Sequence, residues 1–173
     1  MKNVLYKVLS LSLFFLSSSL LIIYCKKAPL AANASIVNID NKKIGTVELI
    51  QEKNGVRLKI DIKGLAPGNH AFYIHERGDF KTPDFKQAGG HFNPFNEEHG
   101  LKNPKGSHIV VKKDGTCSAE MLAENVTLRK GEKNSLLKKG GTSIIIHKMA
   151  DDNKSNPSGK TGPRIAGGII IKS

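Results

Sequence analysis

The feature of this sequence that most constrains its fold is a series of short segments in which apolar and polar residues alternate. Residues 45–52 and 56–62 form two such segments, and the turn between them contains Asn54 and Gly55. Asn-Gly between two alternating segments is the strongest short-range signal of a β-hairpin. Eight short strands separated by turns, without a convincing helix, predict an all-β sandwich or barrel. Residues 35–40 alternate in the same way, and the other predicted strands are 71–75, 109–112, 117–122, 142–147 and 165–171.

The length and composition of the chain fit one such domain. Its 173 residues are enough for one domain with a substantial core, and 24% charged and 39% hydrophobic residues are ordinary for a globular protein. The formal net charge is +12, and the lysines are scattered along the chain. We interpret this charge first as a solubilising basic surface. The alternative is attraction for an anionic polymer or a small anionic substrate, and no specific nucleic-acid site is predicted.

The first 25 residues differ from the rest and predict export. Lys2 and Lys7 precede an uncharged apolar stretch at 9–24, which is short for a membrane span and typical of a secretory signal peptide. Cys25 lies where bacterial lipoproteins are cleaved and acylated. We therefore expect a membrane-anchored lipoprotein of the cell envelope, in the periplasm or at the cell surface. A plain N-terminal membrane anchor, or cleavage at another position, is the alternative.

Lipidation at Cys25 would divide the chain into a leader at 1–25, a tether at 26–33 and a folded domain at 34–173. Cys117 would then be the only thiol left, because the chain contains two cysteines. No intrachain disulfide is predicted in that case, which is unexpected for an exported domain.

Residues 76–108 form a long irregular stretch rich in Gly, Pro, Asn and His, and a loop of that length is usually functional. Successive side chains in a strand point to opposite faces, so His75 shares a face with Tyr73. His70 lies on the other, apolar face together with Phe72. We therefore predict that His70 is a hydrogen-bonded structural residue and not a metal ligand.

Three histidines within this long loop are candidate metal ligands. His91, His99 and His108 are spaced by eight and nine residues, which is not a zinc-finger pattern. A metal ion bound by three imidazoles can order a loop that has no core of its own. Solvated loop histidines are the alternative. His147 ends a strand, and it could complete a site with His75 and His91.

Four blocks of the sequence resemble the copper/zinc superoxide dismutase family. They occur in the family's order and together cover roughly residues 35–172. Residues 64–76 are similar to the family's GL-PG-HGFHIHE segment, 88–94 with 99–100 to its AGGHFNP…HG zinc loop, 144–152 to its VVHEKADD segment, and 161–170 to its C-terminal G-R-ACGVI segment.

The resemblance implies an eight-stranded Greek-key β-barrel, an immunoglobulin-like sandwich, with two long metal-bearing loops. It also implies two cofactors, zinc and copper. On the copper side, His75, His91 and His147 fall on ligand positions. On the zinc side, the resemblance assigns His91 as the bridging ligand, joined by His99 and His108.

The resemblance assigns supporting roles to two further residues. Asp151 falls on the position of a carboxylate that hydrogen-bonds histidines of both metal sites, an orienting role that is common around metals. Arg164 falls on the position of the arginine that guides superoxide at the mouth of the channel. Arginine suits this role because its charge is permanent and its guanidinium is planar.

The departures from the family pattern concern both metals. Tyr73 occupies the position of the family's other copper histidine, so Tyr73 is an additional candidate ligand on the copper side. The family's disulfide pair falls on Phe80 and Gly167. The aspartate that is the family's fourth zinc ligand has no counterpart, because Ile109 follows His108 directly. The carboxylates that could substitute are Glu97, Glu98 and Asp114.

These departures predict a metal-binding member of the family with weak or absent superoxide dismutation. Superoxide is the expected substrate if activity is retained, and the membrane is the expected partner through the lipid anchor. A non-catalytic zinc- or copper-binding protein and an anion-binding envelope protein are the alternatives. The sequence is compatible with a homodimer.

Overall fold

The computed structural model describes residues 28–96, 107–152, 154–155 and 159–173. In this part of the chain the regular structure is antiparallel β-sheet with one short 3₁₀ helix, Lys86–Ala88. Helices long and apolar enough to cross a membrane are absent from these described ranges. The strands are β1 Ala31–Asn38, β2 Lys43–Glu52, β3 Gly55–Lys63, β4 Gly68–His75, β5 Ser107–Val111, β6 Thr116–Glu124, β7 Ser143–His147, β8 Arg164–Ile169 and β9 Ile171–Lys172.

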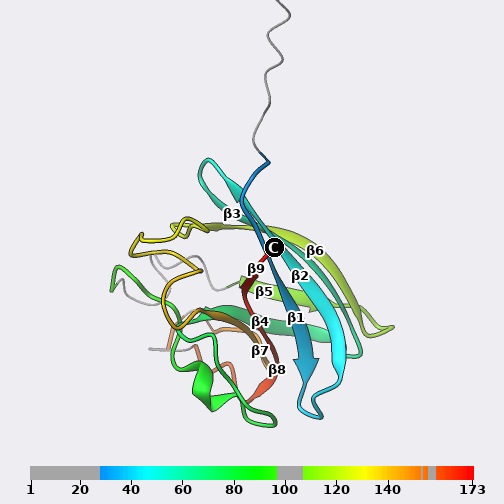
Figure 1. The fold of residues 1–173 in the computed structure, drawn as a ribbon. Helices are drawn as coiled ribbons and strands as arrows, with labels where there is room; N and C mark the ends of the chain where they lie inside the picture. The colour runs from blue at the N-terminus through cyan, green and yellow to red at the C-terminus, as the bar shows by residue number, and fades with distance from the viewer. Residues whose placement is uncertain (1–27, 97–106, 153, 156–158) are drawn as a thin grey trace, which may run out of the picture.

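Eight of these strands follow one another in the order β5-β4-β7-β8-β1-β2-β3-β6, and β9 pairs with β1. The two ends of this order, β5 and β6, are joined by a short turn in which the Lys112 amide donates to the Thr116 carbonyl. The sheet therefore curls into a nearly closed barrel, with β1, β2, β3 and β6 on one side and β4, β5, β7 and β8 on the other (Figure 1). The predicted all-β, eight-stranded barrel is confirmed.

Most strand bounds differ from the predicted ones by a few residues, and two differences change the organisation of the chain. β1 begins at Ala31, three residues before the predicted start of the domain at 34, because residues 31–37 pair with β2. At the C-terminus, the predicted strand 165–171 is divided at Ile170 between β8 and β9.

The predicted hairpin between β2 and β3 forms with a different loop. Glu52 pairs with Gly55, so the two loop residues are Lys53 and Asn54. Gly55 belongs to β3, where a Cβ atom would overlap the carbonyl oxygen of Ala123 on β6. Both its φ of 150° and the close approach of the two backbones therefore favour glycine at this position.

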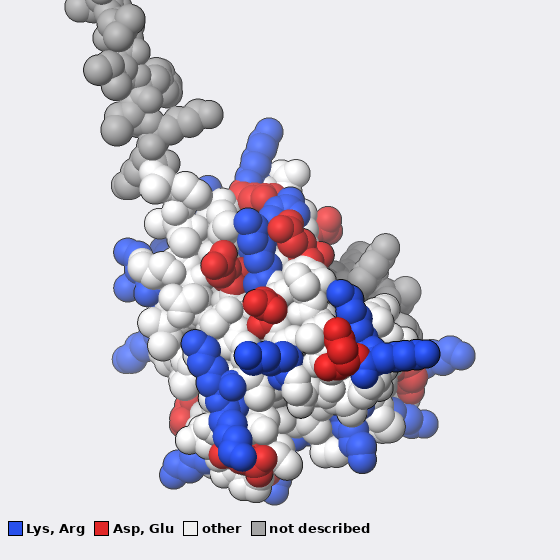
Figure 2. Space-filling view, turned by 90° about the vertical axis from the view of Figure 1, so that its right-hand side faces the viewer, with Lys and Arg blue, Asp and Glu red and all other residues white. Residues whose placement is uncertain are grey.

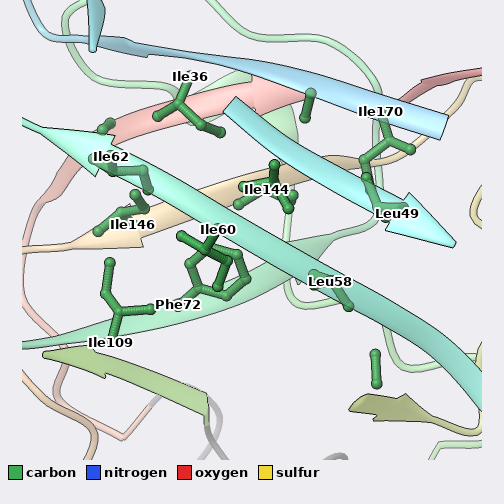
Figure 3. Close-up of a cluster of buried hydrophobic side chains, with 14 of the residues drawn as sticks. Ile36, Leu49, Leu58, Ile60, Ile62, Phe72, Ile109, Ile144, Ile146 and Ile170 are labelled. Atoms are coloured by element: carbon green, nitrogen blue, oxygen red, sulfur yellow. The ribbon is translucent and has the colours of Figure 1, made fainter. Parts of the chain in front are cut away.

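The core lies inside the barrel, where side chains from the two sides point toward one another (Figure 3). Alternate residues of each strand enter it, as the period of two requires. These side chains are almost completely buried, and burial of one such side chain contributes about 2 kcal/mol. The largest contributors that the figure labels are Ile36, Leu49, Leu58, Ile60, Ile62, Phe72, Ile109, Ile144 and Ile146.

The outer face of β2, β3 and β6 carries charges of both signs (Figure 2). Arg57 on β3 forms ion pairs with Glu52 on β2 and Glu120 on β6. Mixed charge on this face agrees with a solubilising surface and does not favour this face as a binding site for an anionic polymer.

Candidate metal centre

Three histidines from distant parts of the sequence meet on the outside of the barrel. Alternation along β4 buries Phe72 in the core and turns Tyr73 and His75 to the opposite face. His147 is the last residue of β7, the strand that pairs with β4. His91 lies on the loop after β4, where it forms an isolated antiparallel bridge with His75.

The side chains of these histidines converge. One ligand atom from each of His75, His91 and His147 lies within 4.8 Å of the others. The His75 and His147 rings are stacked, with centroids 5.6 Å apart, and their Nε2 atoms are 3.4 Å apart. The His91 ring stands nearly perpendicular to both. This arrangement brings nitrogen atoms from three directions toward one point.

Carbonyl groups fix the ring orientation of two of these histidines. Nδ1 of His75 donates to the Gly89 carbonyl at 3.0 Å, and Nδ1 of His147 faces the Gly162 carbonyl at 3.3 Å and the Thr161 hydroxyl at 2.9 Å. A carbonyl oxygen accepts only, so Nδ1 of His75 carries the proton and its Nε2 is a lone-pair donor. Nε2 of His147 lies 3.4 Å from this atom, which suits a cation shared by the two rings.

The surroundings keep these two rings neutral. Burial lowers the pKa of His75 to about 2, opposed by the hydrogen bond to Gly89 and reinforced by the positive charges of His91 and Arg164. Burial likewise lowers the pKa of His147 to about 4. Neutral imidazoles can bind a metal at neutral pH without first releasing a proton. The donor set therefore fits a metal that accepts imidazole nitrogen, such as copper or zinc.

Tyr73 lies against this cluster. Its ring is stacked on the His91 ring, with centroids 3.9 Å apart and an interplanar angle of 23°. Its edge also approaches His147, at 6.1 Å between centroids. Tyr73 is 8% exposed, so the phenol covers one side of the cluster.

Cationic side chains lie beside the open side of the cluster. A pocket beside the cluster is lined by all three histidines and by Gly90, Lys160, Thr161, Gly162 and Arg164. Arg164 begins β8, and its guanidinium donates to the carbonyls of Phe85 at 2.7 Å and Gly89 at 2.6 Å. Two positive charges at this pocket favour a small anion.

The comparisons with known proteins decide the family. A family model described as copper/zinc superoxide dismutase matches residues 43–170. The chain belongs to the copper/zinc superoxide dismutase family. Copper and zinc are the cofactors of this family, and the three-histidine cluster of this member could hold a metal ion.

Individual relatives agree with this assignment. A copper/zinc superoxide dismutase from Aquifex aeolicus is 47% identical over 163 residues, which are 90% of this chain and 95% of the relative. A superoxide dismutase-like protein from Bacillus subtilis is 38% identical over 147 residues, which are 80% of this chain and 75% of the relative. The crystal structure of a dismutase-like protein from Bacillus subtilis matches with a TM-score of 0.75 at 37% identity, over 80% of this chain and 97% of that one.

Only some of the residues predicted for the zinc side of this dismutase-family member lie in the described part of the chain. His108 lies on β5, exposed and opposite Ala71, and this register puts it on the same face as Tyr73 and His75. Asp151 is half-buried in the loop after β7, where a Cβ atom on Gly159 would overlap its carboxylate. His99 and the predicted lipidation site Cys25 lie outside the described residues.

Of the three candidates for a fourth zinc ligand, Asp114 lies in the described part of the chain. Asp114 lies in the turn between β5 and β6, where its carboxylate accepts hydrogen bonds from the Thr116 amide and hydroxyl. These bonds lower the pKa of Asp114 and give this carboxylate a local structural role. Glu97 and Glu98 lie outside the described residues.

The two positions that the resemblance assigns to the family's disulfide, Phe80 and Gly167, carry no cysteine in this chain. Phe85 packs next to Gly167, where a Cβ atom would lie 3.1 Å from the Phe85 ring. Phe80 packs against Phe85, with ring centroids 5.1 Å apart. Apolar contacts therefore join this loop to the sheet near Gly167.

The structural role predicted for His70 agrees with the structure. His70 is buried, and its ring nitrogens lie 3.0 Å from the His147 carbonyl and 2.8 Å from the Ala66 carbonyl. It connects the turn before β4 to the backbone of a candidate ligand.

Sequence reasoning missed the groups that orient the candidate ligands. Gly89, Thr161 and Gly162 each contribute an oxygen atom to a histidine ring. All three stand inside the motif blocks that identified the family. Their contributions come from backbone position, or from a loop that folds back onto β7, and sequence spacing does not report either.

Proposed function

We propose that this protein is a copper- and zinc-binding member of its family in the cell envelope, and that its superoxide dismutation is weak or lost. The observation that carries the proposal is the convergence of three histidines beside a tyrosine. Tyr73 stands where the family resemblance expects another copper histidine. The name of the Bacillus subtilis relative, which calls that protein dismutase-like, is consistent with divergence inside the family.

The proposed copper ligands are His75, His91 and His147. Copper bound by them supplies one-electron oxidation and reduction, the chemistry that dismutation requires. The protein's own contribution is to hold the rings: Gly89 fixes His75, and Thr161 with Gly162 fixes His147. Arg164 and Lys160 attract the anionic substrate to the same pocket.

Tyr73 is the reason for the reduced activity. A phenol has a pKa of about 10 and is protonated at neutral pH, so it is a poor ligand compared with imidazole. As a phenolate it would be a hard anionic oxygen and would favour the oxidised metal. Either state departs from a set of imidazoles that accepts both oxidation states of copper.

Metal analysis of the purified full chain, paired with a dismutase assay, tests this function. We expect bound copper and zinc, together with a kcat/KM about tenfold or more below that of the Aquifex aeolicus dismutase assayed in parallel. Metal binding with full activity would refute the reduced activity. Absence of copper binding would refute the proposed copper site.

On the zinc side, we propose His91, His99 and His108 as ligands, with Asp151 orienting them. Replacing each histidine with alanine in turn should weaken zinc binding by about tenfold or more, because zinc in proteins usually needs four ligands. Zinc titration by calorimetry measures this change. His70→Ala removes a buried histidine outside the set and is the control for general damage to the fold. Equal zinc affinity in all three of these variants and the wild type would eliminate this site.

The proposed location rests on the leader and Cys25. Cys25→Ser should move the protein from the membrane fraction to the soluble fraction, because an acyl chain would no longer anchor it. Cell fractionation followed by immunodetection measures the shift. An unchanged membrane fraction would eliminate lipidation as the anchor.

A further inference from the structure

A second hydrophobic cluster lies outside the barrel core, beneath the loop that carries His91. Phe85 and Ala88 of the loop and Ile145 of β7 are each 0% exposed. Phe80 and Val37 pack against them. The cluster therefore joins a loop that has little regular structure to the rigid sheet.

Phe85 is the centre of this cluster and has an unusual backbone. Its φ is 54°, in the left-handed region, which is unfavourable for a bulky residue. Burial of the ring compensates for this cost. Gly167 on β8 makes the burial possible, because a Cβ atom there would lie 3.1 Å from the Phe85 ring and 2.8 Å from the Ile145 side chain.

The backbone next to Phe85 leads directly to a candidate ligand. Arg164 donates to the Phe85 carbonyl and to the Gly89 carbonyl, which ties both ends of the short 3₁₀ helix to β8. The Gly89 carbonyl also accepts the Nδ1 proton of His75. The position of Gly89, and therefore the orientation of the His75 ring, depends on how the loop packs against the sheet.

We propose that Phe85 is a positioning residue for the three-histidine site. Its buried ring holds the loop against the sheet. The Gly89 carbonyl accepts hydrogen bonds from Arg164 and from His75, so the orientation of the His75 ring depends on the position of the loop. The contact between Phe85 and the sheet is apolar and contains no thiol, so the site is held in place independently of thiol oxidation. The link to metal binding rests on the proposed function, whereas the link to the orientation of His75 does not.

Three variants of the full chain test this role. Phe85→Ala removes the ring, and Phe85→Leu keeps a large apolar side chain. Phe95→Ala makes the same aromatic-to-alanine change in the same loop at a side chain that is 48% exposed. If Phe85→Ala does not fold, Phe85→Val replaces it in the same measurements, because it shortens the side chain without removing it completely.

Two measurements distinguish positioning from a merely structural role. Nitrogen-15 NMR of the metal-free protein at pH 7 reports which ring nitrogen of His75 carries the proton. Titration with Cu²⁺ reports affinity. We expect Phe85→Ala to lose the single Nδ1-protonated form and to bind Cu²⁺ at least about tenfold more weakly, since misplaced ligands lose binding steeply. Phe85→Leu and Phe95→Ala should keep one tautomer and stay within about threefold of the wild type.

The proposal is overturned if Phe85→Ala lowers only the melting temperature while the His75 tautomer and the Cu²⁺ affinity stay unchanged. It is also overturned if Phe95→Ala has the same effects as Phe85→Ala. A wild-type protein that does not bind Cu²⁺ would refute the proposed function instead, and the NMR comparison in metal-free protein would still decide the role of Phe85.

Discussion

Tyr73→His should raise the dismutase activity of the copper- and zinc-loaded protein by about tenfold or more, which corresponds to at least about 1.4 kcal/mol of the activation barrier. The side chain at position 73 lies on the same face of β4 as His75 and touches the His91 ring. A histidine there would add a neutral nitrogen donor next to the existing cluster. Imidazole accepts both oxidation states of copper, so one-electron cycling should become easier.

Tyr73→Phe is the matched control for this prediction. It retains a ring that can stack on His91 and removes only the hydroxyl group. If the phenol oxygen contributes nothing to turnover, its activity should equal that of the wild type. Stopped-flow or indirect dismutase assays measure all three proteins at equal metal content. Equal activity of Tyr73→His and the wild type would show that Tyr73 does not limit the reaction.

Much of this site could be predicted because strand alternation is a strict rule. The period of two along β4 separated His75 from His70, and the structure confirms that separation. His147 could be assigned because it ends a predicted strand and falls on a ligand position of the family, and the structure shows it at the end of β7, whose five residues are all buried. Side chains at the ends of buried strands are held in place by the barrel, so their positions follow from the fold.

The parts that could not be predicted depend on contacts between loops. Phe85 has a left-handed backbone and a fully buried ring, and nothing in the loop sequence distinguishes it from Phe80. Gly55 combines a φ of 150° with a close approach to Ala123, which is distant in sequence. Such positions are set by packing after the barrel has closed, so sequence periodicity carries no signal for them.

Acid should destabilise the metal-free protein well above the pH at which carboxylates titrate. The pKa of His75 falls to about 2 and that of His147 to about 4 in the folded protein, chiefly because burial penalises the charged ring. In the unfolded chain both have a pKa near 6.5. The unfolded state therefore binds about one more proton than the folded state at pH 6.5 and nearly two more at pH 4.5, so the free energy of unfolding falls as the pH falls. Integrated over that window at about 1.4 kcal/mol per proton per pH unit, the loss is about 4–5 kcal/mol.

Urea unfolding of the metal-free protein at several pH values measures this slope. His147→Gln removes one of the two groups, so it should reduce the loss between pH 6.5 and 4.5 to about half. His108→Gln makes the same change at an exposed position on β5 and should leave the slope as it is in the wild type. The free energy of unfolding should depend on pH more steeply for the protein with bound metal, because protons then compete with the metal for the same nitrogen atoms. A free energy of unfolding that stays constant from pH 6.5 to 4.5 would mean that these rings are not buried as neutral groups.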